Sequence, residues 1–161
     1  MKKLNKDNKG FSLVELLVVI AIMVVLVGVI APTLLNNIEK SREARDVQTL
    51  DSIAGAIQTA IIDEDVYKTV SDNNKKVMTL DSLYTAAGTK ITDILAKPNV
   101  AKDFSGTSVE DSATIYYLYV DGKITVFIGK SGYAVPTGEV TDIADADALT
   151  GKRGTVYKVT R

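Results

Sequence analysis

The sequence of 161 residues contains no cysteine and no histidine. Without cysteine, the chain can form neither a disulfide nor a thiolate metal site. Without histidine, it lacks the commonest general base and the commonest metal ligand of proteins. No other nucleophile and base stand together in a recognisable catalytic motif. We therefore expect a protein that is not an enzyme and that needs no cofactor.

The charge balance also excludes a class of partner. The formal net charge is −1, so no basic field attracts nucleic acid. Hydrophobic residues make up 46% of the chain, and much of this apolar content lies before residue 36. The remainder has the composition of one polar domain with a modest core.

The N-terminal region combines a short basic segment with a long apolar one. Residues 1–10 contain four lysines and one aspartate, and residues 16–38 contain no charged side chain. As a helix, this stretch of 23 residues would be about 35 Å long, which is enough to cross a bilayer. An ordinary secretory signal would have a shorter apolar region, and its best cleavage site would precede Pro32, a poor place to cut. A single-pass anchor with its basic end in the cytoplasm explains the length and orientation better.

A simple anchor does not explain Glu15, an acid at the start of the apolar segment. A carboxylate at the bilayer centre costs about 2.5–3.5 kcal/mol, and less near the edge, so this residue needs a partner. Cleavage between Gly10 and Phe11 would create a positive α-amino group on Phe11. A charge pair away from water is far stronger than in water.

The stretch Gly-Phe-Ser-Leu-Val-Glu-Leu at residues 10–16 resembles the leader-peptidase junction of type IV pilins and type II secretion pseudopilins. The resemblance implies that the leader is cut after Gly10 on the cytoplasmic side and that the new N-terminal Phe11 is methylated. It also implies that Glu15 pairs with the N-terminus of a neighbouring subunit during filament assembly. Ser12 stands where threonine is usual in this family.

The same resemblance implies the partners and the location of the protein. The partners would be a prepilin peptidase, identical subunits in a helical filament, the membrane assembly platform of the pilus machinery and, before assembly, the lipid bilayer. The precursor would be a single-pass protein of the cytoplasmic membrane, and the assembled filament would be extracellular.

Pro32 lies inside the apolar segment and has two interpretations. Proline removes one N–H donor and crowds the carbonyl four residues back, here that of Gly28. The result is either a simple kink in a membrane helix or, as the resemblance implies, a point of bending or melting when helices pack in a fibre.

From Glu39 the pattern becomes amphipathic and predicts that one helix continues from Phe11 to about Ile62. The apolar positions recur at intervals of three and four, which defines one helix face: Val47, Leu50, Ala54, Ile57 and Ile61. The charged run from Glu39 to Asp46 is interpreted as a solvated face, with salt bridges between subunits as the alternative.

The rest of the chain predicts a small helix and an antiparallel sheet. A helix is expected over 81–97, capped by Thr79 or Asp81, split by Gly88 and ended by Pro98. Strands are expected at 113–120, 123–128, 133–135 and 155–160, with a tight turn at Asp121-Gly122. This order gives an α+β fold that resembles the pilin fold. We expect a leader at 1–10, a transmembrane and filament-core segment at 11–38, and a globular head at 39–161.

Three aspartates near the C-terminus provide a weak alternative to a metal-free protein. Asp142, Asp145 and Asp147 place oxygen ligands close together in the sequence, and some pseudopilins bind calcium in a comparable loop. The EF-hand spacing is absent, so a solvated acidic loop is the preferred interpretation.

The leading functional hypothesis is the major subunit of a surface type IV pilus that serves adhesion, aggregation or twitching motility. The motif at residues 10–16 does not separate this hypothesis from a pseudopilin of a type II secretion-like system or a DNA-uptake pilin. A hypothesis of another class is a membrane-anchored binding module that never polymerises.

Overall fold

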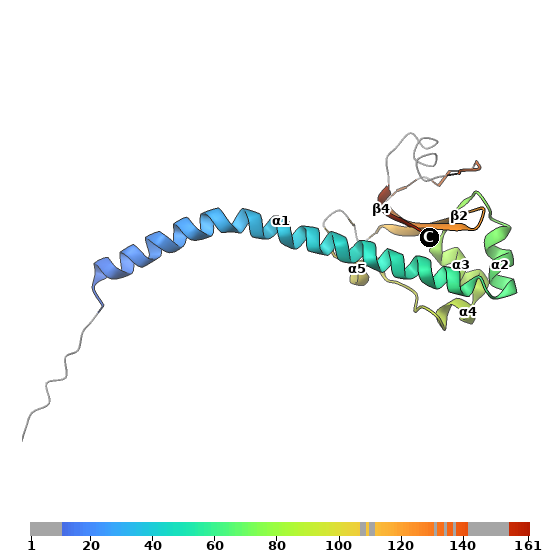
Figure 1. The fold of residues 1–161 in the computed structure, drawn as a ribbon, viewed down its shortest axis with the longest axis horizontal. Helices are drawn as coiled ribbons and strands as arrows, with labels where there is room; N and C mark the ends of the chain where they lie inside the picture. Colours follow the sequence, from blue (N-terminus) through green and yellow to red (C-terminus); the bar gives the residue numbers. More distant parts are fainter. Residues whose placement is uncertain are drawn as a thin grey trace, which may run out of the picture. The chain divides into compact units, whose positions relative to one another are not determined.

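The computed structural model describes residues 11–106, 109, 112–130, 132–133, 135–136, 138–141 and 155–161. The chain divides into two compact units, residues 1–38 and residues 39–161. The elements of the described chain are, in order: α1 (Leu13–Ala60), α2 (Glu64–Ser71), β1 (Val77–Thr79), α3 (Leu80–Ala87), α4 (Thr89–Thr92), α5 (Val100–Asp103), β2 (Thr114–Val120), β3 (Lys123–Gly129) and β4 (Thr155–Thr160) (Figure 1).

Helix α1 is continuous for 48 residues and has two chemically different parts. Up to Ile38 its large apolar side chains are exposed, and this part is long and apolar enough to cross a membrane. In the second unit the helix buries one face only: Asp46, Leu50, Ile53, Ala54, Ala56, Ile57 and Ala60. The predicted helix is therefore confirmed, although it ends at Ala60 rather than at Ile62.

The buried face of α1 packs against one side of a four-stranded antiparallel sheet in the order β1-β2-β3-β4. Ile115 and Tyr117 of β2 lie on this side, opposite Ile128 and Val126 of β3. The period of two along each strand sends alternate residues to the other side. There Leu118, Tyr116 and Phe127 form a second, smaller core with Val77 and Val140. The prediction of a long helix on a small antiparallel sheet is confirmed.

Local chemistry explains several element boundaries. Thr79 caps α3 by accepting a hydrogen bond from the backbone N–H of Ser82 at 3.2 Å. Gly88, with φ of 58°, separates α3 from α4, as predicted. The turn between β2 and β3 places Asp121 at φ 47° and Gly122 at φ 90°, the left-handed conformations that a two-residue hairpin turn requires.

Two predictions about secondary structure were wrong. No helix or strand was expected between Ile62 and residue 81, but this stretch contains α2 and the edge strand β1. Asp63 begins α2 by accepting hydrogen bonds from the N–H groups of Asp65 and Val66. The strand expected at 133–135 is not formed by its described residues, Tyr133 and Val135. The ring of Tyr133 packs on Tyr116 and Phe127 instead.

Two predictions about the amphipathic part of α1 also need correction. Val47 was placed on the buried face, yet it is 38% exposed. Asp46 was placed on a solvated face, yet it is fully buried. Its Oδ1 accepts from the N–H of Ser105 at 3.0 Å, and its Oδ2 accepts from the N–H of Gly106 at 2.7 Å. A buried carboxylate is costly unless it is hydrogen-bonded, and these bonds meet that requirement. They also join α1 to the segment after α5.

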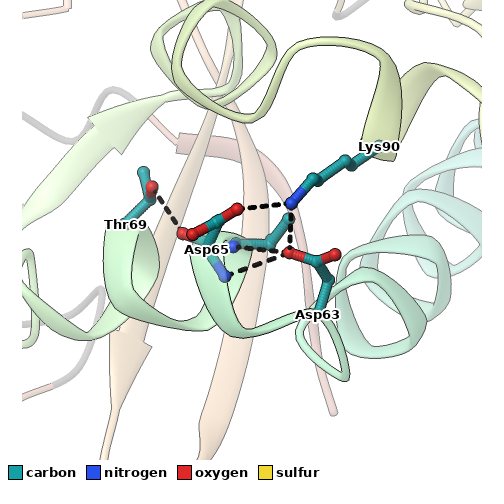
Figure 2. Close-up of polar contacts among 5 residues, drawn as sticks. Asp63, Asp65, Thr69 and Lys90 are labelled. Atoms are coloured by element: carbon teal, nitrogen blue, oxygen red, sulfur yellow. Dashed lines mark hydrogen bonds and ion pairs between the residues drawn. The ribbon is translucent and has the colours of Figure 1, made fainter.

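A second polar contact holds the far end of the head. The Nζ of Lys90 in α4 lies 3.0 Å from Oδ1 of Asp63 and 2.5 Å from Oδ2 of Asp65. Figure 2 shows Lys90 pointing at both carboxylates at the start of α2. The hydrogen bond from Lys90 lowers the pKa of Asp63, and the carboxylates raise the pKa of Lys90. Lys90 therefore offsets the repulsion between two neighbouring acids.

Replacing Asp46 with alanine should destabilise the head. Asp46→Ala leaves the buried N–H of Gly106 and that of Ser105 without their acceptor. We expect a loss of about 1–3 kcal/mol in the free energy of unfolding, because one orphaned buried donor, the N–H of Gly106, costs that much. Urea denaturation of the full-length protein in detergent micelles would measure it. Lys40→Ala, at an exposed position of the same helix, is the control; equal effects of the two substitutions would contradict this role.

The contact of Lys90 should make stability depend on pH. Because the pKa of Asp63 is lowered in the folded protein, its contribution is present above the unfolded value of about 3.9 and is lost as the pH falls through the folded value. We expect the melting temperature of the wild type to fall more between pH 6 and pH 3 than that of Lys90→Met. Lys102→Met, an exposed lysine of α5, should behave as the wild type. The same pH profile for Lys90→Met and wild type would contradict this assignment.

Candidate functional site: the start of the long helix

The residues expected to serve cleavage and assembly lie at the start of α1. Gly10 lies outside the described residues, so the junction itself has no structural description. Phe11 precedes the helix and is 90% exposed. Glu15 is an exposed acid in the first turn of α1. The two described members of the set are thus four positions apart on an exposed helix end.

Glu15 has a partner within its own chain that the sequence analysis missed. Its Oε2 accepts a hydrogen bond from the backbone N–H of Ser12 at 2.9 Å. The N–H of Leu16 donates to the carbonyl of Ser12 at 3.2 Å and closes the first turn. Ser12 is therefore the residue before the helix, and Glu15 is its third helical residue. In the sequence, Ser-x-x-Glu is the signature of a capping box, in which this acid bonds back to the first backbone N–H.

The capping position changes the electrostatic description of Glu15. The first N–H groups of a helix have no partner within the helix, and the helix dipole favours a negative charge at this end. Glu15 meets both requirements, so its carboxylate has a partner even before any cleavage. The donor is the amide of Ser12, which remains an amide when the chain is cut between Gly10 and Phe11. A new α-amino group on Phe11 would then adjoin the amide that Glu15 already contacts.

Pro32 lies inside α1, and the helix continues through it. A side chain at Gly28 would meet no atom within 4 Å, so this glycine is not required by any contact in the described residues. The missing N–H of Pro32 leaves the carbonyl of Gly28 without its usual donor. Whether this point bends or melts in a filament stays a prediction.

The calcium alternative falls on residues that have no structural description. Asp142, Asp145 and Asp147 all lie outside the described residues. Within the described part of the chain, no group of three or more acidic side chains is arranged to hold a metal ion.

Comparison with known proteins gives a finding that does not depend on the structure. Residues 5–31 match the family model described as the prokaryotic N-terminal methylation motif. This segment includes Gly10, Phe11, Glu15 and the first part of the apolar helix. No solved structure is significantly similar to the chain.

Similar proteins include the type II secretion system core protein G of two bacteria. The chain is 32% identical over 79 residues to that of Vibrio cholerae serotype O1, which covers 49% of this chain and 53% of the relative. It is 31% identical over 75 residues to that of Klebsiella pneumoniae, which covers 47% of this chain and 54% of the relative. The chain thus spans about half the length of the curated relatives it matches.

The methylation motif, the similarity to core protein G and the fold agree with one another. Together they support a relation of the chain to the type IV pilin-like and pseudopilin family. The apolar start of α1 and the motif indicate a membrane-anchored precursor.

Proposed function

We propose that the chain is a pseudopilin, a subunit that polymerises through its N-terminal helix into a short filament of a type II secretion-like system. The observation that supports this most is the position of Glu15, which follows Phe11 by four residues at the start of an exposed apolar helix. The similarity to core protein G of type II secretion favours a pseudopilus over a surface pilus. Adhesion and twitching motility have no support beyond the shared motif.

Maturation would begin with a cut after Gly10 by a prepilin peptidase, followed by methylation of Phe11. Before the cut, residues 1–10 would stay in the cytoplasm, because their four lysines favour that side of the membrane. Residues 11–38 would occupy the bilayer, and residues 39–161 would form the head on the other side. The ten-residue leader thus serves orientation and processing, and it is absent from the working subunit.

Assembly would exchange lipid for neighbouring helices. Lipid tails are as apolar as leucine, so the transfer of residues 16–38 from lipid to a bundle gains little from hydrophobicity alone. A charge pair is different, because its strength rises steeply as water is excluded. The new amino group of Phe11 and the carboxylate of a neighbouring Glu15 would therefore determine where an incoming subunit stops.

The capping hydrogen bond gives Glu15 a second function beside the charge pair. While a subunit waits in the membrane, the bond from Ser12 stabilises the carboxylate of Glu15 and the first turn of α1. One carboxylate has two oxygens and room for several donors. Glu15 can therefore keep the bond to its own chain with one oxygen and accept a neighbouring amino group with the other.

Substitutions at Glu15 should separate its charge from its capping function. Glu15→Gln keeps an oxygen that can accept from Ser12 but loses the charge, and Glu15→Leu loses both. We expect both variants to insert in the membrane, yet to form filaments at least about tenfold less than wild type, since a charge pair in a dry site is worth more than about 1.4 kcal/mol. Electron microscopy of sheared filaments would measure this.

The control for these variants is the processing step, which mass spectrometry should report as a methylated N-terminus at Phe11 in the wild type and in both variants. Normal filaments from Glu15→Gln would contradict the charge pair and leave the cap as the function of Glu15. Normal filaments from both variants would contradict any assembly function of Glu15 and favour a membrane anchor that never polymerises.

Deletion of the gene should separate a pseudopilin from a surface pilin. We expect loss of secreted protein, with no loss of long fibres from the cell surface. Secretion assays and electron microscopy of the same cells would measure the two effects, and the restored gene is the control. Loss of long surface fibres with normal secretion would contradict the pseudopilin assignment and support the surface pilus.

A further inference from the structure

Arg161, the residue after β4, contacts the long helix far from it in the sequence. Its Nε donates to Oδ1 of Asp51 at 2.7 Å, and its Nη2 donates to Oδ2 of the same carboxylate. Asp51 lies on α1 within the head, 110 positions earlier in the chain. The two parallel bonds use the planar fork of arginine, a geometry that a lysine at this position does not reproduce.

The backbone of Arg161 is fixed as firmly as its side chain. Its N–H donates to the carbonyl of Ile124 at 2.8 Å, and the N–H of Ile124 donates to the carbonyl of Arg161 at 2.8 Å. One position earlier, the hydroxyl groups of Thr125 and Thr160 lie 2.9 Å apart across the same pair of strands. Arg161 therefore extends the ladder between β3 and β4, and its side chain reaches α1 from a defined place.

The helix has a matching gap at Gly55, one turn after Asp51. A Cβ atom built on Gly55 would lie 3.1 Å from Nη1 of Arg161, which is closer than an ordinary contact. Glycine in the middle of a helix destabilises it by about 1 kcal/mol relative to alanine. The guanidinium group thus explains the presence of a glycine that the helix itself does not favour.

The position of β4 shows why this contact matters. Among the described strands, β4 pairs with β3 only and forms the edge of the sheet. Its register with β3 is interrupted between Phe127 and Gly129. The pairing with β3 is thus uneven along its length, and the chain has no cysteine to fix this region by a crosslink.

We propose that Asp51, Gly55 and Arg161 form a clasp that fastens β4 to α1 and so closes the head. The carboxylate attracts the guanidinium group, and Gly55 makes room for it on the helix surface. The pKa of Asp51 is lowered by the hydrogen bond from Arg161, which agrees with this pairing. The clasp does not depend on the proposed function, because every contact in it lies within one head.

Hydrogen exchange of the full-length protein in detergent micelles tests the clasp. We expect Arg161→Ala and Asp51→Asn to speed amide exchange of a peptide over residues 155–161 by about threefold to fivefold, the range of an exposed ion pair with good geometry. A peptide over residues 80–87 should keep its wild-type rate in both variants and so report that the head remains folded. Lys97→Ala, which removes the exposed ion pair of Lys97 with Asp81, is the matched control and should leave β4 unchanged.

A double-mutant comparison of Gly55→Ala in two backgrounds tests the gap. Gly55→Ala should raise the melting temperature more in the Arg161→Ala background than in the wild type, because only the wild type has a guanidinium group in the way. An equal gain in both backgrounds would contradict the function of Gly55. Two results of the hydrogen-exchange experiment would overturn the clasp. The first is a wild-type exchange rate of β4 in Arg161→Ala and Asp51→Asn. The second is an equal change of that rate in Lys97→Ala.

Discussion

The structure depends on one helix that must satisfy two solvents. Over residues 13–38, α1 exposes apolar side chains on all sides, which suits lipid or other helices and is unfavourable in water. Over residues 39–60 the same helix buries one face and leaves the other polar. The change from all-round to one-sided hydrophobicity falls at Glu39, the first charge after Glu15.

Glu15 shows how a single acid becomes tolerable in the first part. An isolated carboxylate on an apolar helix is costly, but at the third position of the helix it accepts the N–H of Ser12 that would otherwise lack a partner. Moving the acid one turn further along would remove both the cap and the favourable end of the helix dipole. The spacing between Ser12 and Glu15 is thus the one that a capping box requires.

The features that the sequence predicted are those decided by neighbouring residues. Thr79 caps a helix, Gly88 interrupts one, and Asp121 with Gly122 turns a hairpin, each through its own backbone conformation or a bond three residues away. The methylation motif is of the same kind, because it is one continuous stretch, residues 5–31. These elements needed no knowledge of the fold.

Several of the features that the sequence did not predict depend on distant partners. Strand β1 has only three residues, and it exists because Val77 to Thr79 pair with the middle of β2. Asp46 looks like one more surface charge until its partners, 59 and 60 positions later, are known. Local propensity contains no information on such a pairing, so a pattern of charges on a helix cannot separate a solvated acid from a buried one.

These distant contacts share a physical purpose. A head that lacks disulfides must hold its segments together by other means, and four acids do so at three points. Asp46 holds the segment after α5, Asp51 holds the end of β4, and Asp63 with Asp65 holds α4. Each acid accepts more than one hydrogen bond or shares a cation. Side-chain to backbone bonds and bidentate pairs fix direction as well as distance, and so they complete a core whose apolar contacts alone are non-directional.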